Sequence, residues 1–544
     1  MSQLFPELTP AQIARIGRHG TLRHVQRGEV LAEPGSAVGH IFVLTTAHLE
    51  IVRQSGDHGV IMTLDTPGMF TGEATMLSGR RGLTQIRASV EGDLFEITRE
   101  ELLGLIQSGS ELSTIIMRAF ILRRAELIAT HVGDAVLLGS DHCAGTLRIK
   151  EFLSRNGHPY TVIDLDRDEG IQETMDRFQI SVADVPVLIC RDHDVLRNPS
   201  NQQIADCLGF NAGIDPSQVR DVVIVGGGPA GLAAAVYAAS EGLDVLVIEA
   251  TSPGGQAGSS SRIENYLGFP AGISGQELAA RAYTQAQKFG TQVMIARNAV
   301  RLACERRPFA VEINDGQPIQ ARTVVIASGA TYRKLALPNV STFDGAGVYY
   351  GASFIEAQIC RDEEVIVVGG GNSAGQAAVF LAETSRHVHV VVRGEGLKAS
   401  MSRYLILRIE TNPNITVHAH TEVTALAGDH HLEQVTWRNS QTEAEETRPI
   451  RHLFSMTGAV PSTEWLKGCV TRDDKGFVRT GADLSHDDLA AAGWPLGRPP
   501  HLLETSLPGV FAIGDVRADS VKRVASSVGE GAIAVAFIHQ VLHE

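Results

Sequence analysis

The sequence predicts a multidomain protein: an N-terminal β-barrel with helices, a small α/β domain, and two larger α/β domains built on parallel sheets. Three observations predict this organisation. At 544 residues the chain is too long for one hydrophobic core and should divide into three or four domains. The first 128 residues carry short apolar runs separated by turn residues. Further on, two glycine-rich signatures, 143 residues apart, each follow an apolar strand and open a helix.

The composition is that of an ordinary globular protein, with 43% hydrophobic and 20% charged residues. A net charge of −15 argues against nucleic acid or an anionic membrane as a partner. No basic segment followed by an apolar run stands at the N-terminus, and no apolar stretch approaches the roughly 20 residues of a membrane span. We therefore expect a cytoplasmic protein. The six cysteines fit this compartment because they lack paired spacing: Cys143, Cys190, Cys207, Cys304, Cys360 and Cys469.

Residues 1–128 should form a β-rich barrel closed by a helix. Strand-like runs occur at 41–44, 49–52 and 93–97, and residues 99–130 place apolar side chains at helical spacing. Within this unit, the helix start from Gly72 to Ala74 offers backbone amides to an anion. Glu73 can accept a hydrogen bond from a ribose hydroxyl, and Arg81 can pair with a phosphate.

Residues 70–84 resemble the phosphate-binding cassette of cyclic-nucleotide-binding domains. The resemblance implies a site for cAMP or cGMP made by Gly72, Glu73, Ala74 and Arg81. The spacing from glutamate to arginine is one residue shorter than in the family, and the family's proline before the arginine is absent. Two interpretations stay open: a domain that binds a cyclic nucleotide, and a barrel that is retained without nucleotide binding.

Residues 129–212 alternate strands and helices, which predicts a small open sheet with parallel strands. Strands are expected at 135–138, 160–165 and 185–190, and helices at 147–154, up to Phe178, and at 202–208. This order, with Val185-Pro186 before a strand, resembles a thioredoxin- or glutaredoxin-like module. The resemblance implies a cis proline that faces the turn at 139–146.

That turn holds one cysteine, Cys143, with Ser140 and Thr146 at the two spacings where a partner cysteine would stand. A helix N-terminus lowers the pKa of a thiol, so Cys143 is a candidate reactive monothiol. The alternative is a degenerate module that serves as a spacer or docking surface.

The first glycine signature follows the apolar strand 221–225. Gly226 makes a tight turn, Gly228 lets the backbone approach a pyrophosphate, and Gly231 permits close packing of helix on strand. The helix N-terminus, which includes Pro229 and Ala230, supplies amide donors for phosphates. The next strand ends at Glu249, whose carboxylate is placed to hold ribose hydroxyls.

Further motifs follow at 254–256, 264–269, 324–330 and 509–515. Together with the glycine signature they resemble the low-molecular-weight thioredoxin reductase family, over about residues 216–544. The resemblance implies a homodimer with a Rossmann-type FAD-binding domain at 216–333 and 453–544 and an NAD(P)H-binding domain at 334–452. It also implies which residues hold FAD: Gly255, Gln256 and Asn265 beside the isoalloxazine ring, Gly329 in the 324–330 motif, and Gly514 and Asp515 at the ribityl chain.

The second signature comprises Gly369, Gly371, Asn372, Ser373 and Ala374, after the strand 364–368. The position that matches Glu249 is Val392, followed by Arg393. Because an arginine without a carboxylate accommodates a 2′-phosphate, we expect NADPH. The reductase family has two arginines here, so the preference over NADH stays open; Lys398 or Arg403 could supply the second cation.

In the thioredoxin reductases a Cys-x-x-Cys precedes the strand of the second signature. The corresponding segment, 347–355, has no cysteine. Exchange of a dithiol needs an attacking thiolate and a second, resolving cysteine, so disulfide reduction in the usual form is excluded here. Cys360 is the nearest thiol in sequence and is expected to be a small buried hydrophobe, as are Cys304 and Cys469.

The sequence therefore predicts an FAD-dependent, NADPH-oxidising oxidoreductase whose acceptor, a small molecule or a protein, is unknown. One alternative is a thioredoxin-disulfide reductase that uses Cys143. A second is a redox sensor gated by a cyclic nucleotide. A ferredoxin- or flavodoxin-reducing enzyme is also considered, although the C-terminal residues 540–544 offer no aromatic ring to stack on a flavin. No metal site is expected.

Overall fold

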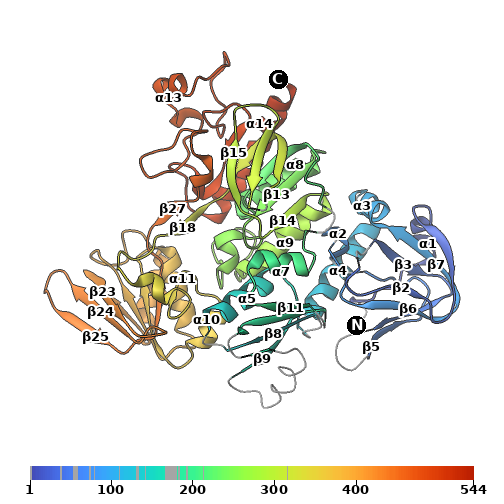
Figure 1. The fold of residues 1–544 in the computed structure, drawn as a ribbon, viewed down its shortest axis with the longest axis horizontal. Helices are drawn as coiled ribbons and strands as arrows, with labels where there is room; N and C mark the ends of the chain where they lie inside the picture. Colours follow the sequence, from blue (N-terminus) through green and yellow to red (C-terminus); the bar gives the residue numbers. More distant parts are fainter. Residues whose placement is uncertain are drawn as a thin grey trace.

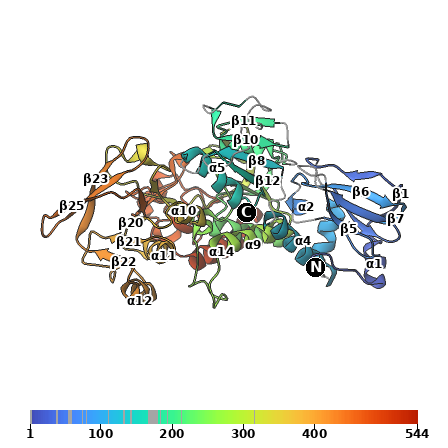
Figure 2. The same cartoon turned by 90° about the horizontal axis from the view of Figure 1, so that it is seen from below.

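The computed structural model describes residues 3–36, 39–52, 59–72, 75–78, 80–108, 111–129, 134–140, 143–165, 180–181, 184–191, 194–211, 214–314 and 316–544. The described chain forms four bodies (Figures 1 and 2). The N-terminal barrel lies at one end and the domain of the second glycine signature at the other. The small α/β unit lies between them, against the domain of the first signature.

The N-terminal unit is the expected β-rich barrel. Two antiparallel sheets, ordered β1-β7-β3 and β2-β6-β4-β5, face each other. Helix α4 crosses the barrel, and Phe120 of this helix packs on Phe70 at 6.4 Å between ring centroids. The elements are α1 (Pro10–Ile16), β1 (Thr21–Val25), β2 (Val30–Ala32), β3 (His40–Leu44), β4 (His48–Val52), β5 (Val60–Leu64), α2 (Thr75–Ser78), β6 (Gln85–Val90), β7 (Gly92–Thr98), α3 (Arg99–Gln107) and α4 (Glu111–Ala129).

The small unit has a four-stranded sheet in the order β11-β10-β8-β9. Strands β8 and β9 are parallel, whereas β10 runs antiparallel to both β8 and β11. The Val185-Pro186 bond is cis, as expected. The elements are β8 (Ala135–Gly139), α5 (Ala144–Arg155), β9 (Thr161–Asp164), β10 (Val187–Cys190), β11 (Asp194–Arg197) and α7 (Asn201–Cys207). The helix expected up to Phe178 lies outside the described residues.

The first dinucleotide domain has a sheet in the order β14-β13-β12-β17-β16-β15, with β28 beside β17. Strands β12, β13 and β17 are apolar and are buried on both faces of the sheet. Helix α8 packs on one face, and side chains of β15 and β16 pack on the other. Its elements are β12 (Arg220–Val225), α8 (Pro229–Ser240), β13 (Val245–Glu249), η2 (Gly255–Ser259), α9 (Gly275–Lys288), β14 (Gln292–Ile295), β15 (Ala299–Ala303), β16 (Phe309–Ile313), β17 (Pro318–Ile326), η4 (Glu464–Leu466), η5 (Gly481–Asp483), α13 (His486–Ala491), β28 (Val510–Ala512), η6 (Gly514–Val516) and α14 (Val524–His543).

The second dinucleotide domain has a parallel sheet in the order β19-β26-β20-β21-β22. Strand β26 is the strand of this sheet that comes last along the chain, and it ends at Ser455. A three-stranded sheet, β23-β24-β25, packs on it, and the pair β18–β27 connects it with the first domain. Its elements are β18 (Ala330–Tyr332), η3 (Val340–Phe343), β19 (Val348–Tyr349), α10 (Phe354–Ile359), β20 (Glu364–Val368), α11 (Asn372–Leu381), β21 (His387–Val391), α12 (Arg403–Thr411), β22 (Ile415–His418), β23 (Thr421–Ala427), β24 (Gln434–Asn439), β25 (Glu445–Arg448), β26 (His452–Ser455) and β27 (Ala459–Pro461).

The cysteines depart from the expectation in one respect. Cys304 and Cys469 form a disulfide that joins the end of β15 to the chain after η4. Both were expected to be unpaired, and that expectation was wrong because 165 residues separate them and only the folded sheet brings them together. Cys360 is fully buried, as expected for a small hydrophobe, and burial raises the pKa of its thiol.

Helix α14 is long and apolar enough to cross a membrane by length and composition. The expectation that no segment approaches such a length was wrong on this measure. A core helix passes the same test, and α14 packs against α8 through a face of small and aliphatic residues. A Cβ atom at Gly531 would stand 2.6 Å from the Ala230 carbonyl oxygen, so the glycine permits this close helix packing.

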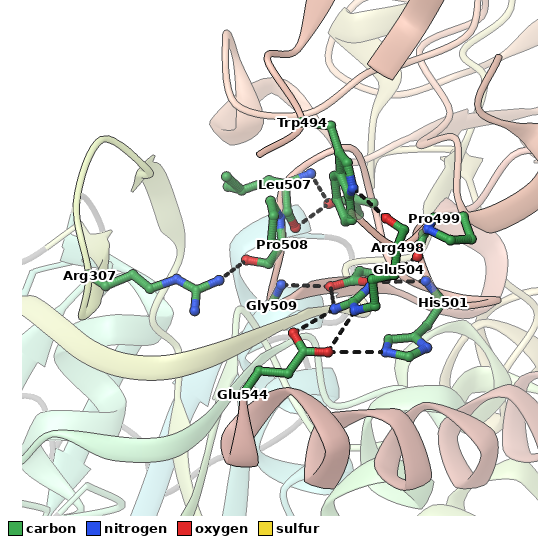
Figure 3. Close-up of polar contacts among 11 residues, drawn as sticks. Arg307, Trp494, Arg498, Pro499, His501, Glu504, Leu507, Pro508, Gly509 and Glu544 are labelled. Carbon is green, nitrogen blue, oxygen red and sulfur yellow. Dashed lines mark hydrogen bonds and ion pairs between the residues drawn. The ribbon is translucent and has the colours of Figure 1, made fainter. Parts of the chain in front are cut away.

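A polar cluster fixes the chain between α13 and β28 (Figure 3). The Glu504 carboxylate is fully buried and accepts hydrogen bonds from the backbone amides of His501 and Gly509, both at 2.9 Å. Arg498 pairs with Glu504 at 2.7 Å and with Glu544, at the end of α14, at 2.6 Å. The cluster thus ties this loop to the C-terminal helix.

Arg498→Ala should lower the free energy of unfolding of the first dinucleotide domain by about 2–3 kcal/mol, because it leaves the buried Glu504 carboxylate without its cation. Thermal release of flavin fluorescence from the purified protein measures this. Arg301→Ala is the matched control, since Arg301 pairs with Glu305 and Glu312 in solvent and should matter much less. Equal shifts for the two variants would contradict the buried role of Arg498.

Candidate functional site

A cavity of about 1310 Å³ lies where the first domain, the second domain and the small unit meet. Both glycine signatures contribute to its wall, as do helix α5 and the segment 348–353. Most of the residues predicted for FAD line it: Gly226, Gly228, Pro229, Ala230, Glu249, Gly255, Gln256, Asn265, Gly329 and Asp515. Gly231 and Gly514 lie behind this wall and shape the backbone instead.

The first signature forms the strand–turn–helix expected of it. Gly226 has φ of 109°, and a Cβ atom there would stand 2.2 Å from the Ala327 carbonyl oxygen. A Cβ atom at Gly231 would stand 1.9 Å from the Gly226 carbonyl oxygen. Glycine is therefore required at both positions for α8 to begin directly above β12. The first turn of α8 opens its free amides to the cavity, where they suit an anion.

Glu249 ends β13 and is almost fully buried at the cavity wall. Its carboxylate accepts backbone hydrogen bonds from Gly227 at 2.6 Å, Thr251 at 2.9 Å and Ser252 at 3.1 Å. Burial raises the pKa of Glu249, and these amides oppose the rise. The side chain is thus held in one orientation, with its remaining acceptor capacity available for ribose hydroxyls.

The segments around Gly329 and Asp515 also border the cavity. Gly329 has φ of 65° and lines the cavity, and a Cβ atom there would meet nothing within 4 Å. The Gln256 side chain donates to the Ala330 carbonyl oxygen, which fixes the 254–256 loop beside it. On the opposite side, burial raises the pKa of Asp515, and Lys522 donates to its carbonyl oxygen at 2.6 Å. These residues fit a flavin dinucleotide in shape and polarity.

The second signature also reaches this cavity. Asn372 and Ser373, at the start of α11, line it, whereas Gly369, Gly371 and Ala374 form the turn and helix behind them. The Asn372 amide oxygen accepts from the Ser402 backbone at 2.7 Å, and Ser373 hydrogen-bonds Tyr332 of the linking strand β18. The amide end of α11 therefore faces the same space as that of α8.

Arg393 is exposed just after β21. Val392 before it is buried, and a Cβ atom at Gly370 would contact the Val392 side chain at 3.4 Å. The position that matches Glu249 is thus occupied by an apolar side chain beside the second signature, with a cation next to it. Lys398 and Arg403 are also exposed nearby in sequence. This set suits a phosphorylated ribose better than a bare 2′-hydroxyl.

The segment without cysteines forms part of the cavity wall. Tyr349, Tyr350, Gly351 and Ser353 all line it. The Tyr350 hydroxyl donates to Asp344 at 2.7 Å, and Tyr349 packs on Phe454. Burial raises the pKa of Glu356 in the helix that follows, and Glu151 of α5 adds repulsion to the same effect. The Glu356 carboxylate, which accepts from the Ser353 backbone and hydroxyl, thus stands at the cavity edge with a raised pKa.

Helix α5 of the small unit covers this side of the cavity. Ala144, Leu147, Arg148, Glu151 and Arg155 line it. Arg155 donates to the Gly255 carbonyl oxygen at 2.7 Å, and a Cβ atom at Gly345 would stand 3.2 Å from the Ala144 Cβ. Sequence reasoning missed Arg155, because nothing local to the helix indicates a partner 100 residues away.

Cys143 is the N-cap residue of α5, directly before the cavity-lining Ala144. The Pro186 ring lies against Gly145, where a Cβ atom would stand 2.9 Å from the proline, so the cis proline faces this turn as expected. Arg148, one turn along α5, also lines the cavity. The turn therefore places one thiol at the edge of the cavity.

The cassette segment of the barrel contacts the rest of the protein. Arg80 is buried, stacks over Phe210 at 4.4 Å from the ring centroid, and donates to the Tyr283 hydroxyl at 3.1 Å and the Asn156 carbonyl oxygen at 3.3 Å. Arg81 lies against the backbone of Gly209. Gly72 has φ of 100°, and its carbonyl oxygen accepts from Arg123 of α4 at 2.8 Å. Glu73 and Ala74 lie outside the described residues.

Comparisons with known proteins agree with this geometry. Residues 220–531 match the family described as pyridine nucleotide-disulphide oxidoreductase, and residues 22–108 match the cyclic nucleotide-binding domain. A thioredoxin reductase of Mycolicibacterium smegmatis is 33% identical over 317 residues, which are 58% of this chain and 94% of that protein. An NADH dehydrogenase of Bacillus subtilis is 32% identical over 330 residues, 60% of each protein.

Among solved structures, the thioredoxin reductase of Lactococcus lactis in its FR conformation superposes with a TM-score of 0.53 at 26% identity. The superposition covers 60% of this chain and all of that one. Among the residues that the structure describes, no cluster of three or more histidine, cysteine, aspartate or glutamate side chains is arranged to hold a metal ion.

Gly231→Ala should reduce the amount of FAD that copurifies with the protein, because the added methyl group collides with the Gly226 carbonyl oxygen and costs about 1–3 kcal/mol. The ratio of flavin to protein absorbance measures it. Gly529→Ala is the matched control: this helical glycine has nothing within 4 Å of a Cβ atom, and alanine there should be neutral or mildly stabilising. Full flavin content in Gly231→Ala would refute the packing role of this glycine.

Proposed function

Because this chain belongs to the pyridine nucleotide-disulphide oxidoreductase family, we propose that it passes electrons from NADPH through bound FAD to an acceptor outside its own chain. The protein is an NAD(P)H-dependent oxidoreductase, and FAD and NADPH are the cofactors of the thioredoxin reductases that it resembles. One observation carries the proposal: the amide ends of α8 and α11 open onto a single cavity.

The residues of each half have separate tasks. The amides at the start of α8 would hold the pyrophosphate of FAD, Glu249 would hold its ribose, and the 254–256 loop with Asn265 would frame its ring. The start of α11 holds the nicotinamide dinucleotide, with Arg393 toward a 2′-phosphate. When both groups are bound, they would supply transfer of a hydride from the reduced nicotinamide to the flavin.

The residues of the cavity wall indicate which kind of electron acceptor the site can use. Tyr349, Tyr350 and Ser353 replace any thiol in the segment that faces the cavity, so no disulfide of this segment can take the electrons. Glu356, whose pKa is raised by burial, is placed to supply a proton to an acceptor that is reduced there.

Anaerobic addition of NADPH to the FAD-loaded protein should bleach the flavin absorbance. Arg393→Ala should raise KM for NADPH about tenfold and leave KM for NADH unchanged, because the lost cation touches only the 2′-phosphate. Arg438→Ala is the matched control, since Arg438 is an exposed cation of the same domain that pairs with Glu422 and Glu443. Flavin that stays oxidised under NADPH would refute the electron path. An acceptor screen of disulfides, quinones, ferredoxin and oxygen then identifies where the electrons leave.

A second candidate is disulfide reduction through Cys143. The position of Cys143 favours it: the residue precedes cavity-lining Ala144, lies at a helix N-terminus and faces the cis proline turn. The small unit would then act as a thioredoxin-like module that carries electrons from the flavin cavity to a substrate disulfide. With one thiol at this position, the second sulfur would come from the substrate itself.

Cys143→Ser should abolish NADPH-dependent reduction of a disulfide substrate and leave bleaching of the flavin intact. The matched control is Cys360→Ser, which removes a fully buried thiol. Both reactions are followed by absorbance in the same preparation, so the two steps separate. Disulfide-reducing turnover that persists in Cys143→Ser would eliminate this candidate.

Regulation by a cyclic nucleotide is the third part of the proposal. Residue Arg80 of the cassette segment hydrogen-bonds Asn156, and the Asn156 side chain in turn donates to the Thr251 carbonyl oxygen at 3.2 Å. Thr251 also donates to Glu249, the residue assigned to the flavin ribose. A ligand that shifts the cassette therefore has a short, packed route to the flavin site.

cAMP or cGMP should change the rate of NADPH oxidation, and Arg80→Ala should weaken that response because it cuts the route at its start. Direct binding is measured by calorimetry in the same samples. Arg87→Ala is the control, since Arg87 pairs with Glu50 within the barrel. A rate that is unaffected by saturating nucleotide would rule out regulation by a cyclic nucleotide.

The resemblance to the reductases also predicts a homodimer, which sedimentation tests.

A further inference from the structure

Two cysteines outside the flavin cavity lie side by side in the small unit. Cys190 is the last residue of β10 and Cys207 is the last residue of α7, 17 positions later. Cys190 is fully buried, whereas Cys207 is partly exposed. The Cys207 thiol donates to the Asp194 carboxylate, and the Cys190 and Cys207 thiols are close enough to shift each other's pKa. Asp194, which pairs with Cys190 across the β10–β11 hairpin, lies 3.9 Å from the Cys207 sulfur.

The surroundings make the two thiols unequal. The interaction with Cys190 and, after it, that with the Arg191 guanidinium lower the pKa of Cys207, while burial and the charge of Asp194 oppose this shift. Hydrogen bonding to Cys207 and burial raise the pKa of Cys190. An accessible thiol that ionises readily, beside a protected one that does not, is the arrangement found in cysteines that react with oxidants and are then resolved by a partner.

The pair lies at the contact between the small unit and the barrel. A Cβ atom at Gly35, in the turn after β2, would stand 3.2 Å from the Arg191 side chain. On the other side of the pair, Gly209 lies against Arg81 and Phe210 lies beneath Arg80. The residues next to each cysteine in the chain therefore contact the barrel, two of them through the cassette segment.

We propose that Cys207 and Cys190 are a redox-active dithiol that a peroxide oxidises to a disulfide, altering the contact between the small unit and the barrel. This site is separate from the flavin cavity and does not rest on the electron path proposed above. Cys190 stands at the end of β10 opposite Ala135, whereas Cys143 follows the far end of β8. The two thiol sites thus lie at opposite ends of the small sheet.

The chemistry balances with hydrogen peroxide as the oxidant. The Cys207 thiolate attacks one peroxide oxygen, the O–O bond breaks, and hydroxide leaves and takes up a proton as water. The Cys190 thiol then attacks the sulfur of the Cys207 sulfenic acid, an S–S bond forms, and the S–O bond breaks to release a second water. Two thiols lose two electrons and two protons, and one peroxide becomes two waters.

Peptide mapping tests the proposal in the full-length, FAD-loaded protein. The reduced protein is exposed to a small excess of hydrogen peroxide, its remaining thiols are blocked, and it is digested without reductant. We expect a peptide pair joined through Cys190 and Cys207 that dithiothreitol separates. Before oxidation, Cys207 should be alkylated on the order of tenfold faster than Cys190. Absence of the joined pair overturns the proposal, whatever the protein does with NADPH.

Single-cysteine variants distinguish the thiol that reacts with peroxide from the thiol that then forms the disulfide. In Cys190→Ser, dimedone should trap a sulfenic acid on Cys207, and in Cys207→Ser neither the disulfide nor the adduct should form. Cys360→Ser is the matched control, because it removes another fully buried thiol and should leave the disulfide unchanged. Retained flavin content verifies that each variant is folded, and the wild-type mapping decides the question if Cys190→Ser does not fold.

Hydrogen–deuterium exchange tests the link to the barrel. Oxidation should change exchange in residues 33–36 and 208–211 of the wild-type protein and leave Cys207→Ser unchanged. A disulfide that forms without any change in these segments overturns the coupling to the barrel.

Discussion

The close backbone contact at the first glycine signature is the constraint on which the rest of the flavin-binding half depends. Because Gly231 has no side chain, α8 begins within contact of the Gly226 carbonyl and lies flat on β12. The alanine-rich face of α8 then lets α14 pack closely over it through Gly531. A side chain at any of these glycines would force the helices away from their neighbours and distort the cavity wall that they support. The interior has no spare volume to absorb the added atoms.

The cavity is a product of three units, and the small unit has a direct part in it. Arg155 holds the Gly255 carbonyl in the loop assigned to the flavin ring, and Asn156 holds the Thr251 carbonyl next to Glu249. The N-terminus of α5 meets Gly345, just before the segment that lacks the dithiol. The small unit therefore covers the side of the cavity on which a reductase of this scaffold would carry its disulfide. An acceptor that enters the cavity from this side would therefore pass α5 of the small unit, whatever the role of Cys143.

Features of the fold and of the site could be predicted from the sequence where the residues that determine them are close together in the chain. The strand–glycine–helix turns and the carboxylate at Glu249 are set by residues within a few positions, and each was predicted. The cis proline at Pro186 was predicted only through the resemblance to a thioredoxin-like module. The Cys304–Cys469 disulfide and the contact of Arg155 with Gly255 join residues 100 or more positions apart. Such contacts depend on how whole sheets and helices pack, and no pattern in one segment specifies the other.

The shortened cassette of the barrel acquires a physical explanation from the same kind of contact. Arg80 is turned out of the barrel, buried between Phe210 and Tyr283, where its cation–π and hydrogen-bond contacts fasten the barrel to both neighbouring units. Arg81, the cation left for a cyclic phosphate, itself lies on Gly209. A ligand that draws Arg81 inward must therefore loosen the contact with the small unit, since one short segment serves both purposes. Under the proposed regulation, nucleotide binding and domain docking are linked through these two arginines, and the proposed disulfide at the end of α7 acts on the same contact.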